Sequence, residues 1–172
     1  LKPGEKIYPY LQNTYSTLSL GYIGVYEATK LITGESHTGE KGHAFAARLM
    51  RRLREAVDTW QEQTGLGFSL YGTPAESLTN RFSSIDRARF GEIEDITDKG
   101  YYTNSYHVDV REPISVFDKF CFESEFQKLS TGGCISYAEI PNMSGNVDAV
   151  LTMMNFIYDN ICYAEFNTKS DY

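Results

Sequence analysis

A turn between a short apolar stretch and a more polar one carries the clearest local signal in this sequence. Residues 72–78 read Gly-Thr-Pro-Ala-Glu-Ser-Leu. Thr73 is a residue type favoured at the N-cap of a helix, and Pro74 has the fixed φ favoured at the first helical position. Glu76 stands three residues after Thr73, which completes a capping box. The pattern therefore predicts a helix that begins at Pro74.

The same turn has features of an anion-binding site. Gly72 permits close approach of the backbone to a ligand, and the amides of Ala75, Glu76 and Ser77 would find no acceptor within the helix. Because the helix dipole adds partial positive charge at this end, phosphate is the expected ligand. A capping box needs no ligand, however, and Glu76 places a carboxylate in the same turn. A purely structural turn is therefore the alternative.

A second group of polar side chains lies near the end of a predicted strand. Asn104 and Ser105 offer hydrogen-bonding groups there, and His107 follows closely. A lone histidine in a strand is more often structural than a catalytic base, and no carboxylate in a recognised pattern orients this one. His107 is therefore interpreted as a structural residue.

Cysteine and glutamate residues near the C-terminus are weaker candidates for chemistry. Cys134 follows two glycines at a predicted strand start, but no Cys-x-x-Cys spacing or paired histidine supports a reactive thiol. Glu139 and Glu165 occupy equivalent positions in two similar strands. In a parallel pair the two carboxylates could lie side by side and raise each other's pKa if buried, or both could face solvent.

Those two strands bracket an amphipathic helix. Residues 135–140 read Ile-Ser-Tyr-Ala-Glu-Ile and residues 161–166 read Ile-Cys-Tyr-Ala-Glu-Phe, while the helix between them carries apolar residues from Val147 to Tyr158. Parallel strands need such a crossover, so this segment predicts a βαβ unit.

The remaining elements follow from hydrophobic periodicity and from Gly and Pro punctuation. They are predicted as helices over 14–32, 39–63, 74–86 and 115–131, and as strands over 66–71 and 102–110. The last of these helices is expected to turn Phe117, Phe120 and Cys121 inward. Residues 1–65 are thus mainly helical and residues 66–172 alternate strands with helices, which favours an α/β fold with mainly parallel strands and flanking helices.

Composition narrows the class of protein. The 172 residues carry a net charge of −7, which argues against a general nucleic-acid or membrane surface. No apolar run approaches the length of a membrane span. The three widely spaced cysteines suit the reducing cytoplasm better than a disulfide framework. Because the sequence starts at Leu1 and stops just past a strand, we expect a single fragment, 1–172, of a larger assembly.

Five ordered motifs together resemble one enzyme family. They occupy residues 21–27, 69–78, 102–108, 132–135 and 163–172. In this order they resemble the anaerobic (class III) ribonucleoside-triphosphate reductases over essentially the whole chain. The resemblance implies part of a ten-stranded α/β barrel of the glycyl-radical enzyme type.

The resemblance also implies an activity. That family makes deoxyribonucleotides by glycyl and thiyl radical chemistry, with structural zinc and ATP or dATP effectors. The residues for these functions are expected outside this chain, so no catalytic residue, cofactor or metal ligand is assigned here, and the isolated chain is expected to be inactive. Implied partners are a ribonucleoside triphosphate, the remaining reductase segments, a radical-SAM activating enzyme and a second copy of the subunit.

By the same resemblance, the turn becomes a substrate-phosphate site formed by Gly72, Thr73, Ala75, Glu76 and Ser77. Residues expected to line the active site are Asn104, Ser105 and Cys134. Two alternatives stay open: a fragment of an enzyme like pyruvate formate-lyase, which shares the barrel, and a non-catalytic structural or assembly module that docks onto a partner chain.

Overall fold

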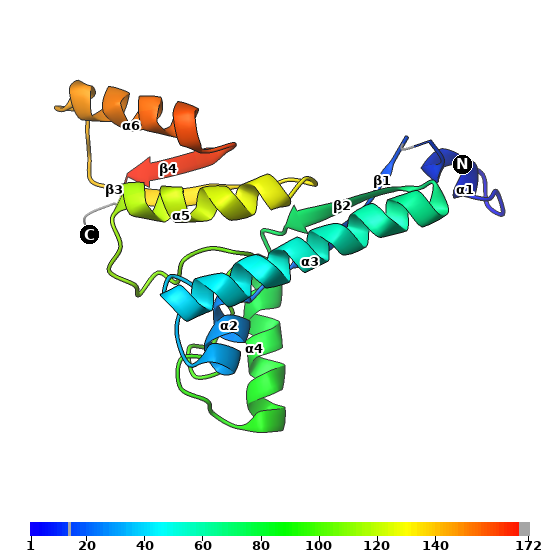
Figure 1. Ribbon diagram of the computed structural model, residues 1–172, viewed down its shortest axis with the longest axis horizontal. Helices are drawn as coiled ribbons and strands as arrows, with labels where there is room; N and C mark the ends of the chain where they lie inside the picture. Colours follow the sequence, from blue (N-terminus) through cyan, green and yellow to red (C-terminus); the bar gives the residue numbers. More distant parts are fainter. Residues whose placement is uncertain (14, 169–172) are drawn as a thin grey trace.

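The computed structural model describes residues 1–13 and 15–168, without the side chain of Glu76. Its elements, in chain order, are α1 Tyr8–Leu11, β1 Thr17–Tyr22, α2 Val25–Thr33, α3 Glu40–Thr64, β2 Gly67–Gly72, α4 Glu76–Phe90, α5 Val116–Leu129, β3 Ser136–Ile140, α6 Val147–Asn160 and β4 Ala164–Thr168 (Figure 1). Thr14 and residues 169–172, which belong to the predicted first helix and to the last motif, lie outside the described residues.

The first half of the chain forms a parallel βαβ arrangement. β1 pairs with β2 from Thr17 opposite Gly67 to Tyr22 opposite Gly72, and α2 and α3 form the crossover between them. α3 lies along β2 (Figure 1). The prediction of one helix over 14–32 was therefore wrong for residues 17–22. In this segment apolar residues alternate with small or polar ones, as Leu18, Leu20 and Tyr22 show. This period of two is typical of a strand, and the segment pairs with β2.

Glycines end both crossover helices. Gly34 and Gly65 adopt the left-handed conformation, with φ of 82° and 69°, and their amides donate to Lys30 O and Gln61 O. Such αL ends satisfy helix carbonyls that would otherwise lack a donor. The predicted helix over 39–63 is confirmed as α3, and the predicted strand over 66–71 is confirmed as β2.

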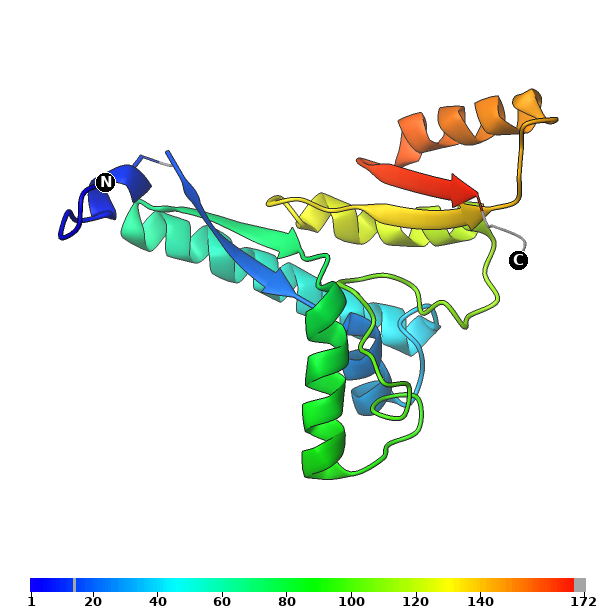
Figure 2. The ribbon, with the colours of Figure 1, turned by 180° about the vertical axis from the view of Figure 1, so that it is seen from behind.

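The closing βαβ unit is also confirmed. β3 and β4 are parallel, α6 connects them, and α5 packs beside β3 and α6 (Figure 2). The register places Glu139 opposite Asn167 and Glu165 opposite Tyr137. The two carboxylates do not lie side by side, because pairing shifts the two similar sequences by two residues. Both residues are exposed, which confirms the alternative that they face solvent.

The two strand pairs meet through the residues just before β3. Gly132 donates its amide to Leu70 O, Gly72 donates to Gly133 O, and Tyr71 forms a parallel bridge with Gly133. A Cβ at position 132 would lie 2.4 Å from Ser69 Oγ, so only glycine permits this approach. The expected α/β fold with parallel strands is thus confirmed, in two pairs linked at one point among the described residues.

The segment predicted as a strand over 102–110 is irregular, so that prediction was wrong. Ser105 has a φ of +40°, which interrupts any extended run. Side-chain carboxylates bind backbone amides in place of a neighbouring strand: Thr103 N donates to Glu27 and Val108 N donates to Glu123.

Two clusters of buried apolar side chains hold these elements together. The larger one joins α2, α3, β2, α5 and the irregular segment. Its buried members are Val25, Ala46, Met50, Val57, Leu70, Tyr106 and Phe126. The smaller one contains Phe120, Ala138 and Ile161.

α5 begins where it was expected, and Ser115 Oγ caps it by accepting the amide of Asp118. Of the three side chains predicted to face inward, only Phe120 is buried, whereas Phe117 is 40% exposed and Cys121 is exposed. None of the described helices is long and apolar enough to cross a membrane.

Candidate functional site

Two helix N-termini lie at the same edge of the first strand pair. β1 and β2 are parallel, so their carboxyl ends, Tyr22 and Gly72, adjoin each other. β1 leads through Gly24 into α2, and β2 leads through residues 73–75 into α4. This edge is where ligands usually bind in open parallel sheets, because amides at helix N-termini point towards it.

The loop of residues 103–105 holds both helix N-termini in place. Gly24 N donates to Thr103 O at 2.8 Å, and Val25 N donates to Ser105 O at 3.3 Å. The Asn104 side chain accepts the amide of Ala75 through Oδ1 at 3.1 Å. The structure therefore brings the predicted lining residue Asn104 to the predicted phosphate turn, although 29 positions separate it from Ala75, whereas Ser105 contacts the start of α2.

The start of α4 differs from the predicted capping box. The helix begins at Glu76 rather than Pro74, its N-cap is Ala75, and it has no side-chain cap. Thr73 Oγ1 donates instead to Tyr71 O at 3.2 Å. A Cβ on Gly21 of β1 would lie 2.2 Å from Thr73 Oγ1, so Thr73 packs against the neighbouring strand. The Glu76 half of the capping box lies outside the described residues.

The first turn of α4 therefore keeps amides for a ligand. The helical ladder starts with Thr79 N donating to Ala75 O, and amides earlier in an α-helix have no acceptor within it. Ser77 is exposed at this point. A cavity of about 190 Å³ adjoins the turn. Its lining residues are Gly21, Tyr22, Ile23, Thr73, Ala75, Leu78 and Phe82.

These described lining residues include no lysine or arginine, so the attraction for an anion comes from the backbone amides and the helix dipole. Gly72, in contrast, has a packing role. Its amide donates to Gly133 O at 3.0 Å, and an added Cβ would lie 3.2 Å from Tyr106 Cε1. Its own N–H is therefore not available to a phosphate.

Cys134 follows Gly133, whose carbonyl accepts the amide of Gly72, and is half-buried against the larger apolar cluster. Burial raises the pKa of its thiol, which keeps it protonated and weakly nucleophilic at neutral pH. Ser105 is only 2% exposed. Of the three predicted lining residues, Asn104 alone is shown to contact the turn directly.

A buried ionic network, which sequence reasoning missed, fixes the loop of residues 103–105. Lys99 Nζ lies 2.5 Å from Glu27 Oε1 and 2.5 Å from Asp109 Oδ2, and all three side chains are at most 4% exposed. Glu27 Oε1 also accepts the amide and the hydroxyl of Thr103, at 2.7 and 2.8 Å. Glu27 Oε1 therefore adds a side-chain link between the loop and α2 to the backbone hydrogen bond from Val25.

The charges in this network set the protonation states. Burial acts to lower the pKa of Lys99, but its hydrogen bonds with Asp109 and Glu27 raise the pKa overall. Burial acts to raise the pKa of Asp109, but hydrogen bonds from Lys99 and Arg111 lower it overall to about 2. Lys99 and Asp109 are therefore both ionised at neutral pH.

His107 lies in an irregular segment beside a buried carboxylate, which the sequence pattern did not reveal. Its Nδ1 lies 3.4 Å from Glu123 Oε1, and Lys119 Nζ lies 2.6 Å from the same oxygen. Glu123 Oε1 also accepts the amide of Val108. Burial opposes ionisation, but His107 and Lys119 lower the pKa of Glu123 to about 2.

The described residues do not fit a zinc site. No group of three or more His, Cys, Asp or Glu side chains converges among them. Cys121 and Cys162 are exposed and Cys134 is half-buried, and none of the three has a disulfide partner. No step of chemistry is therefore assigned to a metal in this part of the chain.

Comparisons with known proteins agree on one family. The family model for "Anaerobic ribonucleoside-triphosphate reductase" matches residues 1–172. The enzyme of that name from Salmonella typhimurium is 40% identical over 173 residues, which cover 99% of this chain and 24% of the relative.

Solved structures show the same fold. One described as "Anaerobic ribonucleotide reductase" superposes with a TM-score of 0.78 at 22% identity, covering 90% of this chain and 25% of that one. The Thermotoga maritima enzyme in complex with dATP and CTP superposes with a TM-score of 0.72 at 20% identity, covering 90% of this chain and 26% of that one. This chain spans about a quarter of the length of the curated relatives it matches, from 24% to 27%.

Proposed function

Because the chain belongs to the anaerobic ribonucleoside-triphosphate reductase family, we propose that it supplies parallel strands and a substrate-phosphate site to such an oxidoreductase. The substrate class is a ribonucleoside triphosphate, and the product is the corresponding deoxyribonucleotide. The alternative of an enzyme like pyruvate formate-lyase is not supported, since the family model that matches the whole chain is that of the reductase.

The start of α4 is the observation that carries the phosphate site. The first-turn amides after Ala75 have no intrahelical acceptors, the N-cap residue provides no side-chain cap, and a cavity of about 190 Å³ adjoins the turn. A capped helix would have used these donors internally. The amide of Ala75 itself already donates to Asn104 Oδ1 and is not available to a phosphate. A solved relative from Thermotoga maritima in complex with dATP and CTP is consistent with a nucleotide site in this family.

The loop of residues 103–105 gives this site its shape. Asn104 Oδ1 accepts the amide of Ala75, and this hydrogen bond fixes the backbone at the start of α4 in the absence of a ligand. Preorganised amides of this kind lose little conformational freedom on binding an anion. Asn104 acts on the phosphate site as a positioning residue in this proposal.

The radical chemistry belongs to other parts of the proposed enzyme. A glycyl radical and a thiyl cysteine would carry the reduction, with structural zinc, and ATP or dATP would act as effectors. A radical-SAM activating enzyme and a second copy of the subunit are the proposed partners, in the cytoplasm. The described residues of this chain would bind and orient the substrate.

Ser77→Asp in the full-length enzyme tests the phosphate site. An aspartate in the first turn stabilises a helix by about 0.3–1 kcal/mol but repels a triphosphate. We expect substrate affinity to fall about tenfold or more, because the repulsion between two like charges near a protein surface costs about 1 kcal/mol or more. Ser77→Asn is the matched control, because it adds similar bulk without charge.

Equilibrium binding of a ribonucleoside triphosphate and thermal unfolding should be measured on the same samples. The proposal requires weaker binding for Ser77→Asp together with equal or higher stability. Equal nucleotide affinity of Ser77→Asp, Ser77→Asn and the unmodified enzyme would show that phosphates bind elsewhere.

A further inference from the structure

The loop that adjoins the phosphate turn contains a strained turn of its own. His107 N donates to Asn104 O at 3.0 Å, so residues 104–107 form a hydrogen-bonded β-turn. Ser105, at the second position of this β-turn, has a φ of +40°. A residue other than glycine rarely adopts such a conformation, so contacts from the surrounding structure must hold it. The side chain of Asn104, at the first position, accepts the amide of Ala75.

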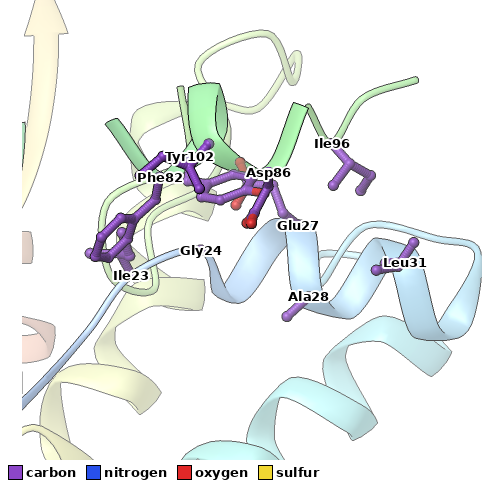
Figure 3. A pocket seen from close by; sticks show the side chains of 10 residues that line it. Ile23, Gly24, Glu27, Ala28, Leu31, Phe82, Asp86, Ile96 and Tyr102 are labelled. Carbon is purple, nitrogen blue, oxygen red and sulfur yellow. The ribbon is translucent and has the colours of Figure 1, made fainter. Parts of the chain in front are cut away.

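The two ends of this β-turn are held by other elements. Before it, backbone amides at the start of α2 donate to carbonyls of the loop, and Figure 3 shows Tyr102, which precedes the loop, above Gly24 and the first turn of α2. After it, Val108 N donates to Glu123 Oε1 at 3.1 Å. The carbonyls in the second half of the β-turn need a further donor, because Tyr106 is fully buried.

His37, in the connection between α2 and α3, provides that donor. Its Nε2 lies 3.0 Å from Tyr106 O and 3.1 Å from His107 O. Both partners are carbonyl oxygens, which only accept hydrogen bonds, so Nε2 carries the proton and donates to the two together. His37 is separated from Tyr106 by 69 positions in the sequence and is 0% exposed.

The imidazole ring of His37 is fixed in one orientation by its neighbours. Its centroid lies 4.9 Å from that of Phe122 and 5.7 Å from that of Tyr26, and both pairs are edge-to-face. The backbone that carries the ring packs closely on α3, because a Cβ on Gly42 would clash with Ser36 O. Burial lowers the pKa of His37, so the ring is neutral at pH 7.

We infer that His37 is a positioning residue for the phosphate turn. By binding two carbonyls of the β-turn at residues 104–107, it holds Asn104 Oδ1 against the amide of Ala75. Each of these contacts is made within the described residues, from the α2–α3 connection to the start of α4. His37 acts on the start of α4 through Asn104, and this role rests on the proposed function for its effect on nucleotide binding.

Two substitutions of His37 separate positioning from packing. His37→Leu fills the apolar site but has no donor, so the two carbonyls are left unpaired. His37→Gln has a side chain of similar length, which can place an amide NH2 where Nε2 lies. His43→Leu is the matched control, because His43 packs against two of the same rings, Phe122 and Phe126. The Nε2 of His43 binds Glu125 on α5 at 2.8 Å.

Hydrogen exchange at the Ala75 amide, followed by mass spectrometry in the full-length enzyme without nucleotide, measures the effect. We expect exchange to be about tenfold faster in His37→Leu than in the unmodified enzyme, and near the unmodified rate in His37→Gln and His43→Leu. Amides in the middle of α3 report on general loss of stability. Unchanged exchange at Ala75 in folded His37→Leu, or an equal increase at Ala75 and in α3, would overturn the inference.

Equilibrium binding of a ribonucleoside triphosphate should be measured on the same samples. Affinity should fall about threefold to tenfold in His37→Leu and recover in His37→Gln, because a mobile site loses more freedom on binding. Faster exchange at Ala75 with unchanged affinity would uphold the role of His37 and count against the phosphate site. Unchanged exchange at Ala75, together with weaker nucleotide binding by Ser77→Asp, would reject the role of His37 and leave the phosphate site intact.

Discussion

The two βαβ arrangements have the same topology but differ in what covers their helices. The first buries Val25 of α2, Met50 and Val57 of α3 and Leu70 of β2 in one cluster. The closing unit leaves Leu151, Met154 and Tyr158 of α6 exposed by 52%, 52% and 87%. Among the described residues, this face of α6 therefore has no cover comparable to the larger cluster. The apolar period of α6 shows its helical nature but does not reveal what covers it.

Polar interactions differ between the two units in the same way. In the first unit a buried cation, Lys99, joins α2 to the loop of residues 103–105 through Glu27. In the closing unit one neutral side chain has the comparable role: Gln127 donates to Ser136 Oγ and Tyr163 O, and accepts from Cys162 N. Removing the charge of Lys99 should therefore lower the stability of the first unit more than that of the closing unit.

Lys99→Met should give the largest loss of stability. Methionine keeps the length of the side chain but leaves the carboxylates of Glu27 and Asp109 buried beside each other without their shared cation. Breaking a buried ion pair in this way costs about 3–5 kcal/mol. Urea unfolding of the full chain would measure the change.

Lys128→Met is the control for this prediction, because Lys128 is exposed on α5. It should change the free energy of unfolding by about 0.5 kcal/mol or less. A similar value for Lys99→Met would mean that the network contributes nothing to the stability of the first unit.

A matched pair of leucine substitutions compares the two cores directly. Leu70→Ala should cost about 3 kcal/mol, because Leu70 is fully buried in the larger cluster. Leu151→Ala on exposed α6 should cost about 0.5 kcal/mol or less. The same unfolding experiment applies to both variants. A large loss for Leu151→Ala would indicate that α6 is covered in solution.

Acid should weaken the first unit through Asp109. Its pKa is lowered in the folded state to about 2 from 3.8, so ionised Asp109 stabilises the fold above its unfolded-state pKa. That contribution, about 2 kcal/mol, is lost as the pH falls from about 5 towards 2. Fluorescence of Trp60 on α3, the single tryptophan, reports on this unit.

The matching measurement is the same acid titration of Asp109→Asn. This variant should be less stable at pH 7 and should lose less further stability on acidification. Parallel acid titration curves for the variant and the unmodified chain would assign the acid sensitivity to other carboxylates.

Several elements could be predicted because the signal was local. α3 combines a long apolar face with a glycine end at Gly65, and α5 has a serine cap at Ser115. The closing unit repeats one strand sequence on either side of a helix. In each case the defining pattern lies within one continuous stretch of the sequence.

β1 and the segment of residues 102–110 were assigned wrongly for opposite reasons. Leu18, Leu20 and Tyr22 alternate as a strand requires, but Leu20 and Ile23 also fit the helical spacing that continues into α2. Residues 102–110 have strand composition, but Ser105 adopts a positive φ and the amides of Thr103 and Val108 bind carboxylates from α2 and α5. The β-propensity of a segment is a weak guide to its structure where side chains compete with a neighbouring strand for its backbone amides.

Neighbouring residues were enough to predict the closing βαβ unit and a helix after β2, and five motifs along the chain were enough to indicate the family. The contacts between Asn104 and Ala75, between Thr73 and Gly21, and among Lys99, Glu27 and Asp109 became visible in three dimensions alone. These contacts join residues far apart in the chain. Hydrogen bonds and ion pairs of this kind depend on three-dimensional distance, which local sequence patterns do not encode.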